Sequence, residues 1–335
     1  MRALLFTAFV VALVAVDIAT LSYRAAEMTE DGPASHALLC VKDACAAALA
    51  FLINKSSSIA CAFYDLDHPV IIAALIDAIE KNKDVRLVLD DRNAKGTPSA
   101  STMARHVRID TDDGQMHNKF CIFDEHVVWT GSMNPTVKGD GQNDNNVVVI
   151  ASGRIASDFL DEFEELWSGI YRRGDRTRKR SVQQGDATIQ ALFCPEDQCA
   201  EKVIETLSRA NETILFMAFS FTHRGIADAL IDAHNRGVTV QGVVEKTGSS
   251  SSSMYNMLHD AGIDARHDAN PAMMHHKVFI ADGRTVITGS FNPTYNGDAR
   301  NDENLLIIRD AELAKPFEEE FRRVFGMARR HETLR

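Results

Sequence analysis

Two short motifs of the same composition could act together on a phosphate group. His117 and Lys119 form the first motif, and His275 and Lys277 form the second. Side chains two positions apart in a strand point to the same face, so each lysine would lie beside its histidine. Imidazole can serve as a nucleophile or as a general acid and base, and an ammonium group can neutralise phosphoryl oxygens. The two motifs therefore predict phosphodiester chemistry.

The surroundings of the motifs are repeated as well. MHNKFCIFDEHVVWTGSMNPT begins at Met116, and MHHKVFIADGRTVITGSFNPT begins at Met274. Each copy continues with an aspartate, a glycine, a serine and an asparagine, which are Asp124, Gly131, Ser132 and Asn134 in the first and Asp282, Gly289, Ser290 and Asn292 in the second. The serine and asparagine side chains are hydrogen-bond donors, so we predict that they bind substrate phosphate. The aspartates begin turns, so a structural role competes with a catalytic one.

The repetition extends over most of the chain and predicts its fold. Residues 59–77 match residues 214–232, and each half reads as alternating strands and helices. We expect helices at 46–53, 70–81, 200–210 and 225–235, and strands at 59–64 and 214–221, from their apolar spacing. The alternation predicts an α/β sandwich with helices on both faces of a mixed sheet. A period of this length indicates a duplicated domain rather than a solenoid.

Two copies of His-x-Lys-x4-Asp followed by Gly-Ser-x-Asn resemble the phospholipase D superfamily, and most closely its small nuclease-type members. The resemblance covers nearly everything after residue 35. It implies two α/β/α sandwich repeats around a pseudo-two-fold axis, with one active site at their interface. It also implies that one histidine attacks phosphorus while the other protonates the leaving oxygen and then activates water. The lysines take the place of a divalent metal, so neither a metal nor another cofactor is expected.

The two histidines are predicted to have different roles. In the superfamily a carboxylate downstream of each motif tends to hydrogen-bond its histidine. Glu303 follows His275 at the spacing at which Asn145 follows His117. A carboxylate favours the imidazolium, so His275 is predicted to be the initial general acid and His117 the nucleophile. Asp144 could replace the missing carboxylate, which would remove the distinction. The predicted catalytic set is His117, Lys119, Asp124, His275, Lys277, Asp282 and Glu303.

The six cysteines and the N-terminal segment indicate the cellular compartment in which the protein is found. Cys40 and Cys45 have the same spacing as Cys194 and Cys199, which predicts two local disulfides and an oxidising environment. A four-thiolate metal site is the alternative. Cys61 and Cys121 lie in apolar strand-like runs and are predicted to be buried and unpaired. An apolar run after Arg2 predicts that residues 1–24 are an export signal or a membrane anchor. The chain is therefore expected to be extracytoplasmic, either secreted or anchored.

The remaining predictions concern domain limits and substrate. Repeats are expected at 35–171 and 187–330, joined by a basic linker at 172–186. That linker could contact a nucleic-acid backbone or be merely solvated. The formal net charge of −11 excludes attraction of a polyanion by the whole surface. The compact repeats favour a nucleic-acid phosphodiester, with a phosphatidylcholine- or cardiolipin-type phospholipid as the alternative. An inactive scaffold is a third possibility, against which the two intact motifs argue. Two motifs in one chain predict activity as a monomer.

Overall fold

The computed structural model describes residues 35–40, 44–94, 103–177, 181–246 and 254–333. The predicted signal or anchor at 1–24 lies outside this range. Within the described residues, the helices are too short or too polar to span a bilayer.

The first half of the chain forms a seven-stranded mixed sheet. Its order is β1-β9-β7-β6-β2-β3-β4. The strands are β1 (Ser35–Leu39), β2 (Ser58–Phe63), β3 (Asp84–Asp90), β4 (Val107–Asp110), β6 (Lys119–Phe123), β7 (Val127–Gly131) and β9 (Asn146–Ala151). β2, β3 and β4 run parallel to one another, and the other neighbours are antiparallel. Runs such as FCIF and VVVI are buried on both faces, which is typical of a sheet covered by helices.

The second half repeats this sheet. Its order is β10-β11-β18-β17-β16-β12-β13-β14. The strands are β10 (Val182–Gln184), β11 (Ala187–Cys194), β12 (Thr213–Ala218), β13 (Thr239–Val244), β14 (Asp264–His267), β16 (Lys277–Ala281), β17 (Thr285–Gly289) and β18 (Asn301–Arg309). The order from β11 to β14 matches that from β1 to β4 in the first sheet. β10 pairs with β11 and lies inside the predicted linker, so the structure has a strand where a surface loop was expected.

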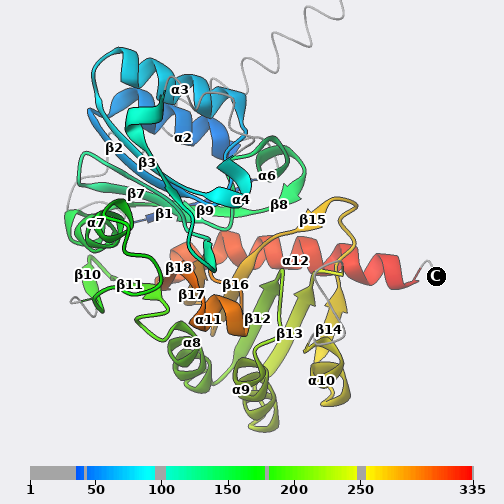
Figure 1. The fold of residues 1–335 in the computed structure, drawn as a ribbon. Coiled ribbons are helices and arrows are strands. Elements are labelled where there is room, and N and C mark those ends of the chain that lie inside the picture. Colours follow the sequence, from blue (N-terminus) through cyan, green and yellow to red (C-terminus); the bar gives the residue numbers. More distant parts are fainter. Residues whose placement is uncertain (1–34, 41–43, 95–102, 178–180, 247–253, 334–335) are drawn as a thin grey trace, which may run out of the picture.

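Helices cover both faces of each sheet, as predicted (Figure 1). The outer faces carry α2 (Ala44–Lys55) and α3 (Pro69–Glu80) on the first sheet, and α8 (Cys199–Ser208), α9 (Arg224–Asn235) and α10 (Tyr255–Asp260) on the second. α7 (Gly153–Trp167) and α12 (Ala311–Thr333) lie between the two sheets. Phe159 of α7 and Phe317 of α12 belong to one buried cluster that includes residues of both sheets. The two repeats therefore share a hydrophobic core and form one body.

Each repeat contributes one short strand that pairs with a strand of the other repeat. β5 (Gln115–Met116) of the first repeat pairs with the beginning of β18 in the second. In the same way, β15 (Met273–Met274) of the second repeat pairs with β8 (Asn143–Asp144) of the first. The backbone N–H of His117 donates to the carbonyl of Asp302 at 2.9 Å, and that of His275 donates to Asp144 at 2.8 Å. Each His-x-Lys motif is thus attached to the opposite repeat at its first residue.

An arginine at the interface holds each exchanged strand. Arg172 donates to Asp110 at 2.6 Å and to Asp302 at 3.3 Å. Arg323 of α12 makes the corresponding contact with Asp144. Because Arg172 is engaged in these ion pairs and its side chain is only 11% exposed, it is not available to a nucleic-acid backbone. Arg172 therefore belongs to the interface between the repeats and not to a solvated linker.

All three possible disulfides are present. Cys40–Cys45 and Cys194–Cys199 are bonded as predicted, which leaves no thiolates for the four-cysteine metal site. The prediction that Cys61 and Cys121 are unpaired was wrong. These residues face each other on β2 and β6 with their Cα atoms 4.1 Å apart, close enough for a cross-strand bond. Three disulfides are typical of proteins in an oxidising compartment.

Candidate active site

A pocket of about 800 Å³ lies between the repeats and brings the two motifs together. His117 and His275 both line it. The strand exchange explains this position, because β5 and β15 lead each motif into the interface. The other lining residues come from matching places in the two repeats and include Tyr64, Asp65, Asp67, Asn134, Thr136 and Lys138 from the first, and Phe219, Ser220, Thr222, Asn292, Thr294 and Tyr295 from the second.

Each lysine is buried behind its histidine. Lys119 donates to the carbonyl of His117 at 2.6 Å, and Lys277 donates to that of His275 at 2.8 Å. Burial lowers the pKa of Lys119 to about 7, although Glu303 opposes the shift. Burial and the charge of Lys119 lower the pKa of Lys277 well below its usual range. A bound phosphate would favour the charged lysines, because a nearby anion stabilises an ammonium group.

An aromatic ring accompanies each motif, and sequence reasoning missed both rings. The Tyr64 ring lies 5.2 Å from the ammonium of Lys119, and the Phe219 ring lies 4.9 Å from that of Lys277. Each ring also meets the neighbouring histidine edge-on, with ring centres 4.7 Å apart. The signal was present, because Tyr64 and Phe219 occupy equivalent positions of the repeated segments 59–77 and 214–232.

The partners of the two histidines are exchanged between the repeats. Nδ1 of His117 lies 2.8 Å from Oε2 of Glu303, and Nδ1 of His275 lies 2.9 Å from Oδ1 of Asn145. The prediction that Glu303 lies behind His275 was therefore wrong. Glu303 follows Asp302, whose carbonyl accepts from the backbone of His117, so the pairing of β5 with β18 carries the carboxylate across the interface. Asp144 is held by Arg323 and does not replace Asn145.

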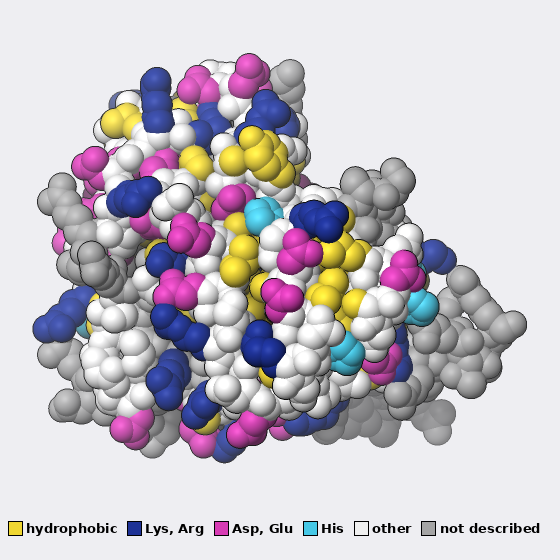
Figure 2. Space-filling model, turned by 90° about the horizontal axis from the view of Figure 1, so that it is seen from below, with side chains coloured by type: hydrophobic (Ala, Val, Ile, Leu, Met, Phe, Trp, Pro, Cys, Tyr) yellow, Lys and Arg dark blue, Asp and Glu magenta, His cyan; other side chains and the backbone are white. Residues whose placement is uncertain are grey.

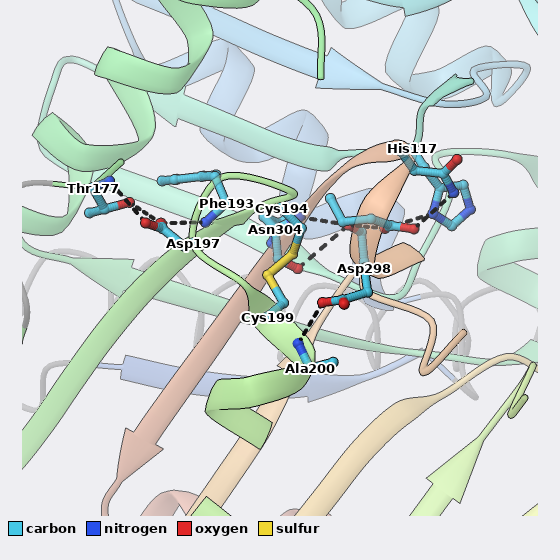
Figure 3. The surroundings of a disulfide bond; sticks show 12 residues. His117, Thr177, Phe193, Cys194, Asp197, Cys199, Ala200, Asp298 and Asn304 are labelled. Atoms are coloured by element: carbon cyan, nitrogen blue, oxygen red, sulfur yellow. Dashed lines mark hydrogen bonds and ion pairs between the residues drawn. A yellow bond between two sulfur atoms is a disulfide. The ribbon is translucent and has the colours of Figure 1, made fainter. Parts of the chain in front are cut away.

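Two serines orient these partners. Ser290 Oγ donates to Oε2 of Glu303 at 2.6 Å, and Ser132 Oγ donates to Oδ1 of Asn145 at 2.9 Å. Both serines are fully buried outside the pocket lining, and their hydroxyl protons are already donated to Glu303 and Asn145. The prediction that they bind substrate phosphate is therefore not supported. Glu303 pairs with Cys194 of β11, whose disulfide to Cys199 joins this strand to the start of α8. Figure 3 shows the disulfide and His117 in the same region.

The carboxylate of Glu303 faces Nδ1 of His117 in a buried environment. It accepts from Ser290 and, at 3.4 Å, from Asn301 Nδ2, which suits the ionised form. Burial raises the pKa of Glu303 to about 8, and Lys119 opposes this shift. Burial lowers the pKa of His117, and Lys119 and Lys277 lower it further. Ionised Glu303 would hold the imidazole proton at Nδ1 and leave the lone pair of Nε2 free for the pocket.

The two asparagines of the motifs lie where substrate would bind. Asn134 and Asn292 line the pocket from equivalent loops. Their Oδ1 atoms are buried without a hydrogen-bond partner among the described residues. Buried amide groups of this kind need a partner, so these side chains have unused capacity for a bound group.

The motif aspartates lie outside the pocket lining. Asp124 Oδ1 accepts from the backbone N–H groups of Ser57 and Ser58 at 2.8 and 2.9 Å. Asp282 accepts from three consecutive backbone N–H groups before β12. Burial tends to raise the pKa of Asp282, but those donors lower it overall. Both aspartates directly follow the far ends of β6 and β16, roughly 16 Å along the chain direction from the lysines. Their catalytic assignment is therefore replaced by a structural one.

The glycines of the motifs permit a close backbone approach. A Cβ atom on Gly131 would lie 2.2 Å from the carbonyl oxygen of Asn146, and one on Gly289 would lie 2.3 Å from that of Asn304. Gly289 also has a φ of +144°, which disfavours side chains. The absence of a side chain at Gly131 and Gly289 thus lets the backbone next to Asn145 and Glu303 lie directly against these glycines.

The pocket rim differs in charge between the repeats. The first repeat contributes Asp65, Asp67 and Lys138. The equivalent positions of the second repeat carry Ser220, Thr222 and Asn296, which are uncharged. Burial raises the pKa of Asp65, and the nearby Asp67 adds to the shift. The rim is therefore weakly acidic on one side and neutral on the other, and Lys119 and Lys277 are buried behind it.

Comparisons with known proteins agree with the duplicated fold. The family model described as "Cardiolipin synthase, PLD-like domain" matches residues 49–167 and 203–325. A phospholipase D of Rickettsia prowazekii is 35% identical over 133 residues, which are 39% of this chain and 64% of that protein. A mitochondrial cardiolipin hydrolase of Xenopus tropicalis is 33% identical over 141 residues, which are 41% of this chain and 67% of that protein. These matches span about two thirds of the relatives' length.

A solved structure extends the likeness to both repeats. The phosphatidylserine synthase of Haemophilus influenzae superposes with a TM-score of 0.66 at 11% identity, covering 88% of this chain and 86% of that one. At this identity the similarity concerns the fold alone. Together with the two matched segments and the paired His-x-Lys motifs, it shows that the chain belongs to the phospholipase D-like family and contains two copies of its domain.

Proposed function

We propose that the protein is a phosphodiesterase that acts without a metal ion through a phosphohistidine on His117. The observation that carries the proposal is the pairing of His117 with Glu303 across the interface, opposite His275 and its neutral partner Asn145. When Nε2 of His117 bonds to phosphorus, the ring gains positive charge, which Glu303 would stabilise. The sequence argument made the carboxylate-bound histidine the general acid, and with Glu303 beside His117 that argument would reverse the roles. The proposal keeps His117 as the nucleophile for another reason, the positive charge that its ring gains when Nε2 bonds to phosphorus.

The other histidine would move the protons. As the Nε2–P bond forms and the bond from phosphorus to the leaving oxygen breaks, His275 gives its proton to that oxygen. It then takes a proton from water, whose oxygen attacks phosphorus and releases His117. Burial and the charges of Lys277 and Lys119 lower the pKa of His275, which favours release of its proton, whereas a bound phosphate anion would favour its protonated form before that step. Lys119 and Lys277 would neutralise the phosphoryl oxygens, the task that a divalent metal performs elsewhere.

We infer that the substrate is a phospholipid. The charged residues of the pocket rim are two aspartates, Asp65 and Asp67, and one lysine, Lys138. Arg172 is held in an ion pair with Asp110 and is not available to a substrate. Figure 2 shows basic and acidic side chains interspersed on the face that it views, without a continuous basic tract. A nucleic-acid backbone is bound mainly by such tracts. The relatives named phospholipase D and cardiolipin hydrolase also support a lipid. The preference for nucleic acid drawn from the compact repeats stays a prediction.

Acid-quenched turnover tests the mechanism. We expect bis(p-nitrophenyl) phosphate to be hydrolysed in the presence of EDTA, and peptide mapping of the quenched enzyme to find the phosphoryl group on His117. A phosphoryl group on His275, or loss of turnover on chelation, would contradict the mechanism. Absence of turnover on every substrate would favour the inactive-scaffold alternative.

Parallel assays test the substrate. Vesicles of phosphatidylcholine or cardiolipin, plasmid, single-stranded DNA and RNA are compared at equal phosphodiester concentration. We expect the phosphatidylcholine vesicles to be hydrolysed faster than the nucleic acids, and faster than the anionic cardiolipin vesicles. The reverse order would support the nuclease prediction and leave the His117 mechanism intact.

A further inference from the structure

Three exposed apolar side chains lie in or next to segments that line the pocket. In the described part of the chain, the large hydrophobic residues with high exposure are Val70, Ile109, Val137, Ile170 and Tyr295. Val137 and Tyr295 are the first residues of α6 (Val137–Gly141) and α11 (Tyr295–Ala299), which are equivalent helices of the two repeats. Their exposed fractions are 49% and 67%. Scattered exposed hydrophobic residues are common, but a matched pair at one opening is not explained by chance exposure.

Tyr295 lines the pocket, and the other two residues closely follow lining residues in the sequence. Thr136 and Lys138, on either side of Val137, both line the pocket, as does Tyr295 itself. Val70 is the second residue of α3 and follows Asp67, whose carboxylate accepts from the backbone N–H of Val137 at 2.7 Å. We call Val70, Val137 and Tyr295 the apolar rim.

The apolar rim is held in place by helix caps. Thr136 Oγ1 accepts from the N–H of Gly139 at 2.9 Å, and Thr294 Oγ1 accepts from Gly297 at 3.0 Å. Each cap fixes the residue that follows it at the start of its helix. Gly139 and Gly297 lie so close to the carbonyls of Asn134 and Asn292 that a Cβ atom would clash. The rim and the asparagines of the pocket therefore form one fixed unit.

We propose that the apolar rim docks the pocket mouth onto a zwitterionic phospholipid surface. This inference rests on the proposed lipid substrate. Valine can enter the boundary between head groups and acyl chains, and tyrosine is enriched there because its ring is apolar and its hydroxyl is polar. Asp65 and Asp67 outnumber Lys138, and the whole chain has a formal net charge of −11, so an anionic surface would repel the mouth. Docking would deliver a head group to His117 and His275 while the acyl chains stay in the membrane.

Vesicle binding and two kinds of substrate test the docking. The double variant Val70→Ser/Val137→Ser removes two apolar side chains that do not themselves line the pocket. We expect its co-sedimentation with phosphatidylcholine vesicles and its turnover of them to fall about tenfold, from the lost apolar burial. Turnover of soluble bis(p-nitrophenyl) phosphate should not change. Ile170→Ser is the matched control, because Ile170 is 41% exposed and lies outside the pocket lining. It should behave as the unaltered protein does.

Several outcomes would overturn the docking proposal. These are unchanged vesicle binding by the double variant, an equal loss with Ile170→Ser, or tighter binding when phosphatidylglycerol is added to the vesicles. A loss on the soluble substrate would show that these valines serve the pocket instead. His117→Ala separates the two proposals, because it should bind vesicles normally without turnover. If the unaltered protein binds vesicles but hydrolyses only nucleic acids, the lipid-substrate proposal fails on its own.

Discussion

At the scale of single residues, the two histidines have the same neighbours except for one. Each has a lysine behind it, an aromatic ring at its edge and a serine that orients its partner. The partner itself is Glu303 for His117 and Asn145 for His275. The sequence predicts which two residues differ, because they stand at equal spacing from the motifs. It cannot predict which histidine each one reaches, since that depends on strand pairing between the repeats.

Replacing the partner carboxylate should damage catalysis more than folding. For Glu303→Gln, we expect kcat to fall about a hundredfold or more, because the amide cannot stabilise the charge on His117. The matched variant Asn145→Gln tests whether any change at the equivalent position has the same effect. Steady-state kinetics and thermal unfolding are measured together. A similar loss in both variants, accompanied by lowered Tm, would indicate a general packing role.

The same carboxylate should shape the pH dependence. The pKa of Glu303 is raised to about 8, so the ionised form increases as pH rises toward that value. The pKa of Lys119 is lowered to about 7, so its positive charge is lost over a similar range. We expect a bell-shaped profile of kcat/KM with its maximum between about pH 7 and pH 8. In Glu303→Gln the acidic side of the kcat/KM profile should move to lower pH. If it does not move, the acidic side is due to the titration of another group.

Stability should depend on pH through this group in a defined direction. Because folding raises the pKa of Glu303, the folded state binds more protons than the unfolded state between about pH 5 and pH 8. Its contribution to stability is therefore lost as pH rises through this window. Relative to the unaltered protein, Glu303→Gln should gain unfolding free energy from pH 5 to pH 8 in urea titrations. A constant difference would mean that the carboxylate stays ionised throughout.

At the scale of elements, the repeated segments predicted the main helices and strands well. The expected helix at 70–81 is α3 (Pro69–Glu80), and the expected strand at 59–64 is β2 (Ser58–Phe63), because their apolar spacing reflects burial. β1 and β11, which precede the cysteine pairs, were not predicted. β5 and β15 are two residues long, too short for any periodic pattern, although they decide which residues meet at the pocket. The Cys61–Cys121 disulfide likewise could not be predicted without knowing the register in which β2 and β6 pair.

The aspartates at the ends of β6 and β16 should matter for folding rather than chemistry. Asp282→Ala removes the acceptor for three backbone N–H groups, so we expect unfolding free energy to fall by about 1–2 kcal/mol. Asp282→Asn keeps one acceptor oxygen and should lose less. Urea unfolding gives both values, and kcat measured below the transition should be unchanged. A large loss of kcat in folded Asp282→Asn would restore the catalytic assignment.

At the scale of the whole molecule, the disulfides stabilise the first repeat unequally. Cys61–Cys121 joins residues 60 positions apart, whereas Cys40–Cys45 spans only 5. In the chain-entropy account, the longer loop contributes about 4 kcal/mol and the shorter about 2 kcal/mol. Cys61→Ala/Cys121→Ala should therefore lower unfolding free energy more than Cys40→Ala/Cys45→Ala, as measured by urea titration. The opposite order would show that local geometry outweighs loop length.

The exchange of β5 and β15 between the repeats also bears on how such a site can diverge. Two identical chains related by a two-fold axis would supply the same residue to both histidines, because any substitution appears twice. A single chain that contains both repeats escapes this constraint. Positions 145 and 303 can then change independently, and the nucleophile and the proton donor can each acquire the partner that suits its step. Gene duplication with fusion thus provides a division of labour that a symmetric dimer of identical subunits cannot reach by point mutation.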